Sequence, residues 1–207
     1  MIENWMKLEA EGKELPADYD ANDNLYITKK GLIALEPYRV KKAIILAAGF
    51  GSRLVPVTLK ITKPLVKVKG VRIIDTLIDA LLAKEIKNII IVRGYKKEQF
   101  NVLKKKYPMI KFVVNKDFNV ANNIASVKMV VDQLESCYIC EADLYISNPN
   151  VISKYEFTTN YLGTKVNETN DWCFDKINGY ARHYRLGGKN CYQAYGISYW
   201  NKKDGIT

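Results

Sequence analysis

A glycine-containing loop in the first third of the chain has the residue types needed to hold a phosphate. The run Leu46-Ala-Ala-Gly-Phe-Gly-Ser-Arg53 directly follows an apolar stretch expected to form a strand. Glycines at positions 49 and 51 allow sharp turns and a close approach of the backbone to a ligand. The N–H groups of such a turn bind anions, and open α/β sheets bind ligands beyond the carboxyl ends of their strands. The run therefore predicts a phosphate-binding loop.

Three phosphate-binding patterns compete for this loop. A dinucleotide fingerprint needs a glycine where the chain has Leu54, and the sequence contains no P-loop. The third pattern is G-x-G-[ST]-R-L-x-P-x-T followed by x-K-P. The chain matches it with Gly49-Phe-Gly-Ser-Arg-Leu-Val-Pro-Val-Thr58 and Thr62-Lys63-Pro64. The ordered match favours this third pattern.

Two carboxylates follow a later apolar run. Asp143 ends the segment Cys137-Tyr-Ile-Cys-Glu-Ala-Asp143, which has the composition of a buried strand. A carboxylate at the carboxyl end of a strand faces the ligand crevice, although an aspartate there can also cap a turn. Residues i and i+2 of a strand share one face, which places Glu141 beside it. Mg²⁺ prefers a few carboxylates with phosphate oxygens and water, so both are candidate metal ligands.

The elements that would position these residues alternate between strands and helices. This β-α-β-α order predicts a Rossmann-like, mostly parallel sheet with helices on both faces. Residues 155–200 are rich in Tyr, Thr, Asn and Gly and predict a small antiparallel β extension, acting as a lid or substrate wall. The predicted core strands are 43–47, 88–93, 111–115 and 137–143, and the predicted helices are 73–83, 98–107 and 122–134.

Residues 43 to about 200 resemble the nucleotidyltransferases that make sugar nucleotides and CDP-alcohols. Several later motifs narrow the resemblance to bacterial CTP:phosphocholine cytidylyltransferases. These motifs are Gly94-Tyr95, Glu98-Gln-Phe100, Ala121-Asn-Asn-Ile-Ala-Ser126, Glu141-Ala-Asp143, Asn170-Asp-Trp172 and Gly196-Ile-Ser-Tyr-Trp200. The resemblance implies a nucleotide-diphospho-sugar transferase type of fold and Mg²⁺-dependent transfer of CMP from CTP to phosphocholine.

Roles follow from the chemistry of that reaction. Arg53 would hold the β- and γ-phosphates as a planar multi-donor cation. Lys63 would reach the α-phosphate and the incoming phosphate, and Asp143 completes the catalytic set. Phosphate cradling and base reading are assigned to Leu46, Ala47, Ala48, Gly49, Gly51, Ser52, Asn122 and Asn123. The two asparagines lie where the family reads the base, although either could instead cap a helix.

The acceptor would carry a trimethylammonium group, which aromatic faces bind. Trp172 is the first candidate, and Tyr195 is the second residue assigned to the acceptor. Tyr180, Tyr192 and Trp200 belong to the same aromatic region, where core packing is the competing interpretation.

Two domains are predicted, residues 1–40 and residues 41–207. The first contains the polar break Asp18-Tyr-Asp-Ala-Asn-Asp-Asn24 and a strand-helix pattern ended by Pro37. It resembles the end of the winged-helix segment in multidomain relatives, which often carry a choline-kinase-like domain downstream. A second metal-binding aspartate of the family lies in a Tyr-Trp-Asp segment that this sequence lacks, and Asp204 does not match it. We therefore expect a C-terminally incomplete transferase domain.

Composition limits the alternatives. The chain is 48% hydrophobic and 26% charged, as in ordinary globular proteins. Its net charge is +10, of which residues 1–40 carry −3 and the remainder +13, so the main domain either attracts polyanions or uses lysines for solubility. No apolar run is long enough to span a membrane, and the N-terminus lacks a signal-peptide pattern, which predicts a cytoplasmic protein without membrane contact.

Other chemistries have less support. Cys137 and Cys140 would point to opposite faces of one strand, which argues against a shared metal, and His183 has no evident triad partner.

Two functional hypotheses compete with a phosphocholine cytidylyltransferase. The second hypothesis is a sugar-1-phosphate or phosphonate nucleotidyltransferase. The third is a regulatory module that binds nucleotide or nucleic acid without catalysis, which the basic domain motivates. The absence of a visible recognition helix makes nucleic acid the weaker partner.

Overall fold

The computed structural model describes residue 12 and residues 16–22, 24–119 and 123–205. The chain divides into two compact units, Met1–Arg39 and Val40–Thr207, which are described separately. Within the described residues, no helix has the length and apolar character needed to cross a bilayer.

The N-terminal unit consists of a short antiparallel hairpin and a helix. Thr28 is the N-cap residue of the helix, and its Oγ1 accepts a hydrogen bond from the backbone N–H of Gly31 at 3.2 Å. Pro37 lies in the 3-10 turn that follows it. The elements are β1 (Ala17–Tyr19), β2 (Leu25–Ile27), α2 (Lys29–Leu35) and η1 (Glu36–Tyr38). Their assignment to a winged-helix segment stays a prediction.

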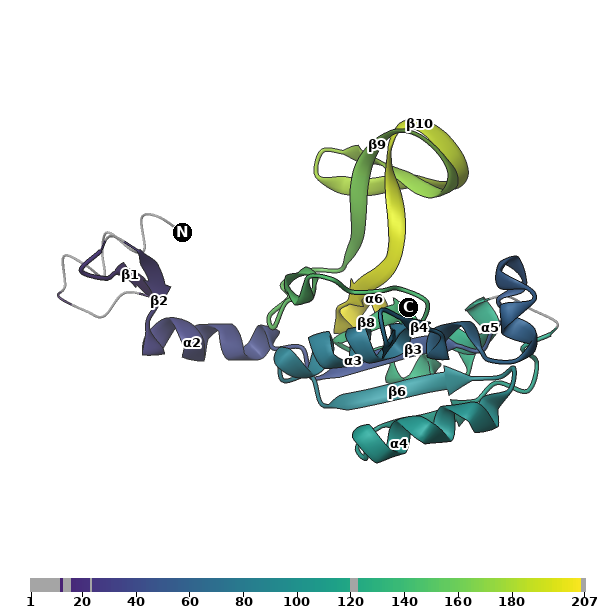
Figure 1. Cartoon of the computed structure of the whole chain (residues 1–207). Helices are drawn as coiled ribbons and strands as arrows, with labels where there is room; N and C mark the ends of the chain where they lie inside the picture. The colour runs from purple at the N-terminus through teal and green to yellow at the C-terminus, as the bar shows by residue number, and fades with distance from the viewer. Residues whose placement is uncertain (1–11, 13–15, 23, 120–122, 206–207) are drawn as a thin grey trace. The chain divides into compact units, whose positions relative to one another are not determined.

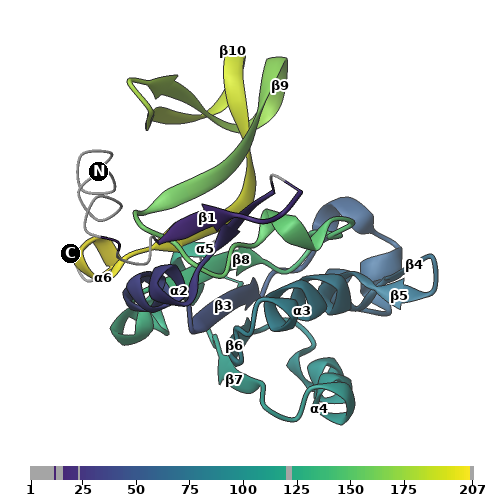
Figure 2. The same cartoon turned by 90° about the vertical axis from the view of Figure 1, so that its left-hand side faces the viewer.

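A six-stranded sheet in the order β7-β6-β3-β8-β10-β9 organises the C-terminal unit (Figures 1 and 2). The first four strands of this order are parallel, and β10 joins β8 in the antiparallel direction. The strands are β3 (Lys42–Ala47), β6 (Asn88–Arg93), β7 (Lys111–Val114), β8 (Cys137–Glu141), β9 (Asn160–Ile177) and β10 (Tyr180–Trp200). The predicted α/β class with a small antiparallel extension is confirmed.

Helices connect the parallel strands, and two of them differ from prediction. Segment 98–107 begins as a 3-10 helix, and segment 122–134 breaks after Lys128. The break precedes the β-branched pair Val130-Val131, which has low helix propensity. The α-helices are α3 (Ile73–Ala83), α4 (Leu103–Lys106), α5 (Asn123–Lys128) and α6 (Lys202–Gly205). Short elements are β4 (Lys67–Val68), β5 (Val71–Arg72), η2 (Ser52–Leu54), η3 (Val57–Leu59), η4 (Lys63–Leu65), η5 (Lys97–Val102), η6 (Val131–Gln133) and η7 (Pro149–Val151).

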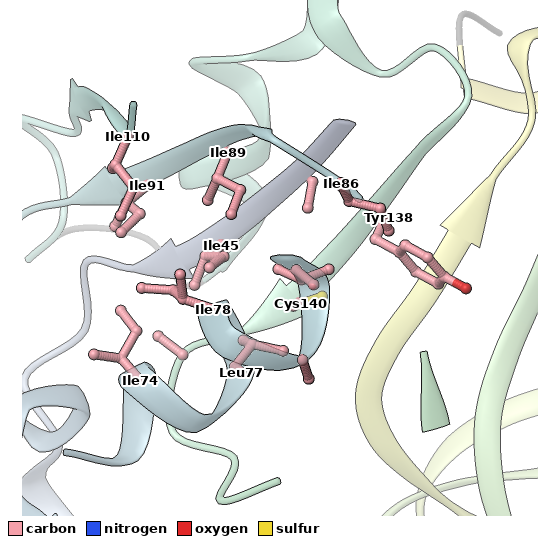
Figure 3. Packing of buried hydrophobic residues seen from close by; sticks show 14 of the residues in the cluster. Ile45, Ile74, Leu77, Ile78, Ile86, Ile89, Ile91, Ile110, Tyr138 and Cys140 are labelled. Carbon is pink, nitrogen blue, oxygen red and sulfur yellow. The ribbon is translucent and has the colours of Figure 1, made fainter. Parts of the chain in front are cut away.

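The core lies on both faces of the parallel strands because their side chains alternate. Ile45 of β3 packs in the larger cluster with Leu77 and Ile78 of α3 (Figure 3). Its neighbour Ile44 packs on the opposite face with Val130 and other residues of a smaller cluster. Burial on both faces explains why these strands are continuously apolar. The packing of β3 between the two clusters holds the strand from whose carboxyl end the glycine loop begins.

β9 and β10 form a long hairpin that stands away from the plane of the sheet (Figures 1 and 2). It turns at Asn178-Gly179, where both residues have positive φ, as a tight hairpin turn requires. Gln193 of β10 pairs with Thr164 on one side and with Cys173 on the other. The distal part of β9 is thus folded back against β10, which returns residues near 172 toward the sheet.

Candidate functional site

A cleft of about 690 Å³ opens at the carboxyl ends of the parallel strands. The loop after β3, Asn115 after β7 and Asp143 after β8 all line it. β9 and β10 supply the rest of the wall, including Trp172 and Tyr195. The cleft therefore gathers residues from elements that are distant in sequence.

The glycine loop is held in a fixed conformation. Gly51 has a φ of +65°, and a Cβ atom there would lie 3.0 Å from Thr58 Cγ2 and 3.1 Å from Lys63 Cβ. The Thr58 hydroxyl donates to the Gly51 carbonyl at 3.1 Å, and the Tyr95 N–H donates to the Ala48 carbonyl at 3.0 Å. The predicted loop residues Leu46, Ala47, Ala48, Gly49, Gly51 and Ser52 all line the cleft. These contacts constrain the loop, whose residues form one rim of the cleft.

Two cations from the predicted set line the same cleft. Arg53 is exposed, and among the described residues its guanidinium has no hydrogen-bond or ion-pair partner. Lys63 Nζ lies 2.5 Å from Asp143 Oδ2, and both side chains are about one-third exposed. The structure thus brings the three predicted catalytic residues to one cavity.

The sequence predicted that Asp143 ends the fourth core strand, but in the structure β8 ends two residues earlier. The strand stops at Glu141, the Ala142 N–H donates to the Leu46 carbonyl at 3.2 Å, and Asp143 lies in the turn that follows. Both carboxylates line the cleft. Glu141 packs against Gly196, where a Cβ atom would lie 2.6 Å from Glu141 Oε2.

These two carboxylates have the hard oxygen donors that Mg²⁺ prefers, together with phosphate oxygens and water. No group of three or more His, Cys, Asp and Glu residues within the described part of the chain could hold a metal by itself. The donor set thus fits a metal that is shared with a phosphate ligand, and magnesium binding stays a prediction.

Of the two asparagines predicted to read the base, only Asn123 belongs to the described part of the chain. Asn122 lies outside the described residues, and Asn123 is the first residue of α5. Sequence reasoning missed Asn115 and Ser126, which line the cleft and share a buried hydrogen bond of 3.1 Å. It also missed Phe118. The signal for Asn115 was available, because this residue is the last of a predicted strand, at the ligand-binding edge of the sheet.

An aromatic group lines the hairpin side of the cleft. Trp172 and Tyr184 stack with ring centroids 5.1 Å apart and an interplanar angle of 8°. Their exposed fractions are 48% and 52%, so each ring keeps accessible surface. The Tyr161 and Tyr184 hydroxyls are 3.5 Å apart. Burial raises the pKa of the Tyr161 hydroxyl above its ordinary value.

Not every aromatic residue of the extension reaches the cleft. Tyr192 stacks on Phe174, the Trp200 indole N–H donates to Ser198 Oγ, and Tyr180 is exposed near the hairpin turn. None of these three is among the described residues that line the cleft. Asp171 is there beside Trp172, although the sequence had not singled it out.

Cys137 and Cys140 are buried in the core, and His183 forms a hydrogen bond with a carboxylate of the hairpin. Cys140 packs in the larger core cluster and Cys137 in the smaller one, on opposite faces of β8 as predicted. Burial raises the pKa of the Cys137 thiol to about 11. His183 does have a carboxylate partner, because its Nδ1 lies 2.9 Å from Asp175 Oδ2. That carboxylate also accepts two hydrogen bonds from Arg185.

Comparisons with known proteins identify the family and the fold. Residues 42–161 match a family model described as nucleotidyl transferase. A 2-aminoethylphosphonate cytidylyltransferase of Lancefieldella rimae is 39% identical over 167 residues, or 78% of this chain and 68% of the relative. A choline-phosphate cytidylyltransferase of Haemophilus influenzae is 31% identical over 78% of this chain and 70% of its own length. The solved CTP:phosphocholine cytidylyltransferase of Streptococcus pneumoniae aligns with a TM-score of 0.74 and 34% identity, covering 81% of this chain and 73% of that one.

Proposed function

Because the chain belongs to the nucleotidyl transferase family, we propose that it transfers CMP from CTP to phosphocholine, giving CDP-choline and pyrophosphate. The observation that carries the proposal is the shared cleft. The glycine loop, the Lys63–Asp143 pair and the Trp172–Tyr184 stack all line one cavity.

The reaction needs positioning rather than a general base. A phosphate oxygen of the acceptor attacks the α-phosphorus of CTP, a new P–O bond forms, and the bond to the β-phosphate oxygen breaks. The acceptor phosphate is already anionic near neutral pH, so the main cost is to bring two anions together. The loop amides, Arg53 and Lys63 would offset this repulsion, since fixed donors act strongly on developing charge.

Glu141 and Asp143 are the residues that would hold Mg²⁺ in this proposal. When bound, the metal would neutralise charge on the triphosphate. The chain's own contribution is to keep these carboxylates at the cleft, Glu141 against Gly196 and Asp143 beside Lys63. Cations and carboxylates at one point suit a ligand that brings both phosphate and metal.

Phosphocholine is supported by the aromatic wall. A quaternary ammonium has no N–H group to donate, so it is recognised by aromatic faces, and Trp172 and Tyr184 expose such faces in the cleft. A second acceptor, 2-aminoethylphosphonate, is favoured by Asp171, whose carboxylate could accept hydrogen bonds from a primary ammonium. The 39% identical relative carries that substrate in its name. The two acceptors share an anionic phosphorus group and a cationic nitrogen.

Turnover with defined acceptors tests the proposal. The protein is incubated with CTP and Mg²⁺ plus phosphocholine, 2-aminoethylphosphonate or glucose-1-phosphate, and products are identified by ³¹P NMR. Formation of CDP-choline at the highest kcat/KM is the expected result. A higher kcat/KM with 2-aminoethylphosphonate would make that compound the acceptor in place of phosphocholine. Turnover of glucose-1-phosphate alone would overturn the proposal that the acceptor carries a cationic nitrogen. Nucleotide binding without any turnover would support a non-catalytic module instead.

A further inference from the structure

A second cavity, of about 870 Å³, lies behind the turn that carries Lys63. It opens among β4, β5, the start of α3 and η5, and among the described residues it shares no lining residue with the first cleft. Four basic side chains line it, Lys60, Lys67, Arg72 and Lys106, against one acidic side chain, Asp75.

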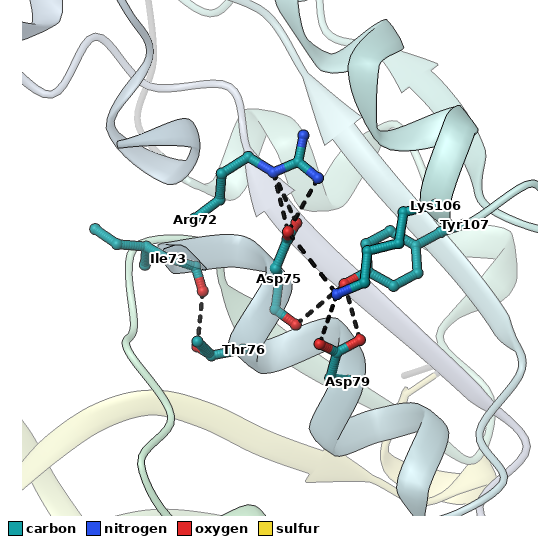
Figure 4. A network of polar contacts seen from close by, with 7 residues as sticks. All are labelled: Arg72, Ile73, Asp75, Thr76, Asp79, Lys106 and Tyr107. Carbon is teal, nitrogen blue, oxygen red and sulfur yellow. Dashed lines mark hydrogen bonds and ion pairs between the residues drawn. The ribbon is translucent and has the colours of Figure 1, made fainter. Parts of the chain in front are cut away.

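The acidic residue in this cavity is already neutralised. Arg72 donates from Nε to both oxygens of Asp75 at 3.0 Å, and Lys106 Nζ binds Asp79 at 2.8 Å (Figure 4). The Asp75 side chain is only 9% exposed, so this pair is a built part of the wall. The side-chain ammonium groups of Lys60 and Lys67 have no hydrogen-bond or ion-pair partner among the described residues. Their uncompensated charges favour an anion in the cavity.

The same cavity has an apolar wall. Val71 and Val102 line it and are 41% and 44% exposed, and Leu65 lines it from the core side. An inorganic anion would leave this apolar surface in water, whereas a ligand with an apolar or planar body would cover it. We propose that the second cavity binds a small organic phosphate with an apolar or planar body, and that its occupancy acts on Lys63 through Gln99.

Gln99 provides the connection. Its Oε1 accepts from the Thr62 N–H at 3.0 Å, and its Nε2 donates to the Lys60 carbonyl at 2.9 Å. Thr62 directly precedes η4, whose residues Lys63 and Leu65 line the first and the second cavity respectively. One short turn thus forms part of both walls, and a ligand that displaces Gln99 or Leu65 would move Lys63. This coupling rests on the proposed function, whereas binding itself does not.

Pyridoxal 5′-phosphate is a suitable probe, because it joins a phosphate, a planar ring and an aldehyde that condenses with lysine amines. The protein is treated with a sub-stoichiometric amount in the presence of CTP, reduced with borohydride and mapped by peptide mass spectrometry. Labelling concentrated on Lys60 or Lys67 is expected, and it should fall about tenfold with pyridoxal, which lacks the phosphate and its charged hydrogen bonds. Labelling confined to Lys63, or spread evenly over exposed lysines such as Lys87 and Lys189, would overturn the site. This readout requires no turnover.

The coupling has its own test. The labelled protein is separated from the unlabelled protein, and the kcat for pyrophosphate release is compared between the two, in the natural chain and in Gln99→Leu. A change of at least about threefold that disappears in Gln99→Leu supports transmission. Identical rates before and after labelling would overturn the coupling, and a change that persists in Gln99→Leu would exclude Gln99 as its route. If neither labelled nor unlabelled protein releases pyrophosphate while the label is found on Lys60 or Lys67, the proposed function is rejected and binding in the second cavity is retained.

Discussion

Lys63 Nζ and Asp143 Oδ2 form an ion pair of 2.5 Å that joins two turns 80 residues apart in the chain. The pair lies in the cleft that the glycine loop lines. The proposed phosphate-binding cation and the candidate metal ligand are therefore paired with each other in this structure. Removing either partner should affect both phosphate binding and metal binding. The next two predictions therefore measure the role of Lys63 and the role of Asp143 separately.

Lys63→Ala should lower kcat/KM for CMP transfer by about 10²–10³-fold, the usual effect of deleting one donor aimed at developing charge. Initial rates of pyrophosphate release measure it. Lys87→Ala, which removes an exposed lysine outside the cleft, serves as the control and should leave the rate unchanged. A Lys63→Ala protein within about threefold of the natural rate would remove Lys63 from the mechanism.

Asp143→Asn should raise the Mg²⁺ concentration needed for half-maximal rate by at least about tenfold, because an amide is a weaker ligand for a hard cation. A Mg²⁺ titration after chelator treatment measures this shift. Asp132→Asn, on an exposed 3-10 turn, is the matched control. An unchanged Mg²⁺ requirement in Asp143→Asn would contradict the assignment of this carboxylate.

Gly196→Ala should disturb Glu141 specifically. Gly196 has a φ of +60°, and the added Cβ would lie 2.6 Å from Glu141 Oε2. Gly179→Ala is the matched control, since Gly179 has a φ of +84° with no atom within 4 Å of an added Cβ. Both variants should lose about 1–2 kcal/mol of stability to backbone strain. Gly196→Ala alone should also raise the Mg²⁺ requirement, and equal Mg²⁺ curves for both variants would contradict this role of Gly196.

Much of the site was predictable because its signals are local. The loop follows one recognisable strand, Lys63 belongs to the motif that continues from the loop, and the two carboxylates lie at the end of another strand. Parallel strands bring their carboxyl ends to one edge. Tyr184 and Asp171 were not predictable in the same way. Their place in the cleft depends on β9 folding back beside β10, through several register shifts that no periodicity reveals. Likewise, Asp143 lies in a turn because the β8 ladder stops at Glu141, a boundary that apolar composition does not fix.

Trp172→Ala should raise KM for the acceptor by about 10–30-fold while KM for CTP stays constant, because a desolvated cation–π contact contributes about 2 kcal/mol. The Trp172–Tyr184 stack would lose one ring and Tyr184 its support. Tyr180→Ala removes an exposed aromatic side chain from the same hairpin outside the cleft lining and should change neither constant. A parallel rise of both KM values in Trp172→Ala would point to a misfolded hairpin, and no rise would remove the aromatic wall from acceptor binding.

The stability of the hairpin should depend on the ionisation of Asp175. Hydrogen bonds from Arg185 and His183 hold the pKa of this carboxyl below its usual value. A carboxyl group with a lowered folded-state pKa stabilises the fold above its unfolded pKa of about 3.9 and loses this contribution as pH falls through the folded value. Urea unfolding of Asp175→Asn and the natural chain between pH 2 and 7 should therefore differ by a constant amount above about pH 5 and converge at acid pH. Glu168→Gln removes a carboxylate of the same hairpin whose ion-pair partner Lys189 is 3.9 Å away and should show a much smaller difference. An Asp175→Asn difference that persists unchanged to the lowest pH would show that the hydrogen-bond geometry, and not the charge, stabilises the hairpin.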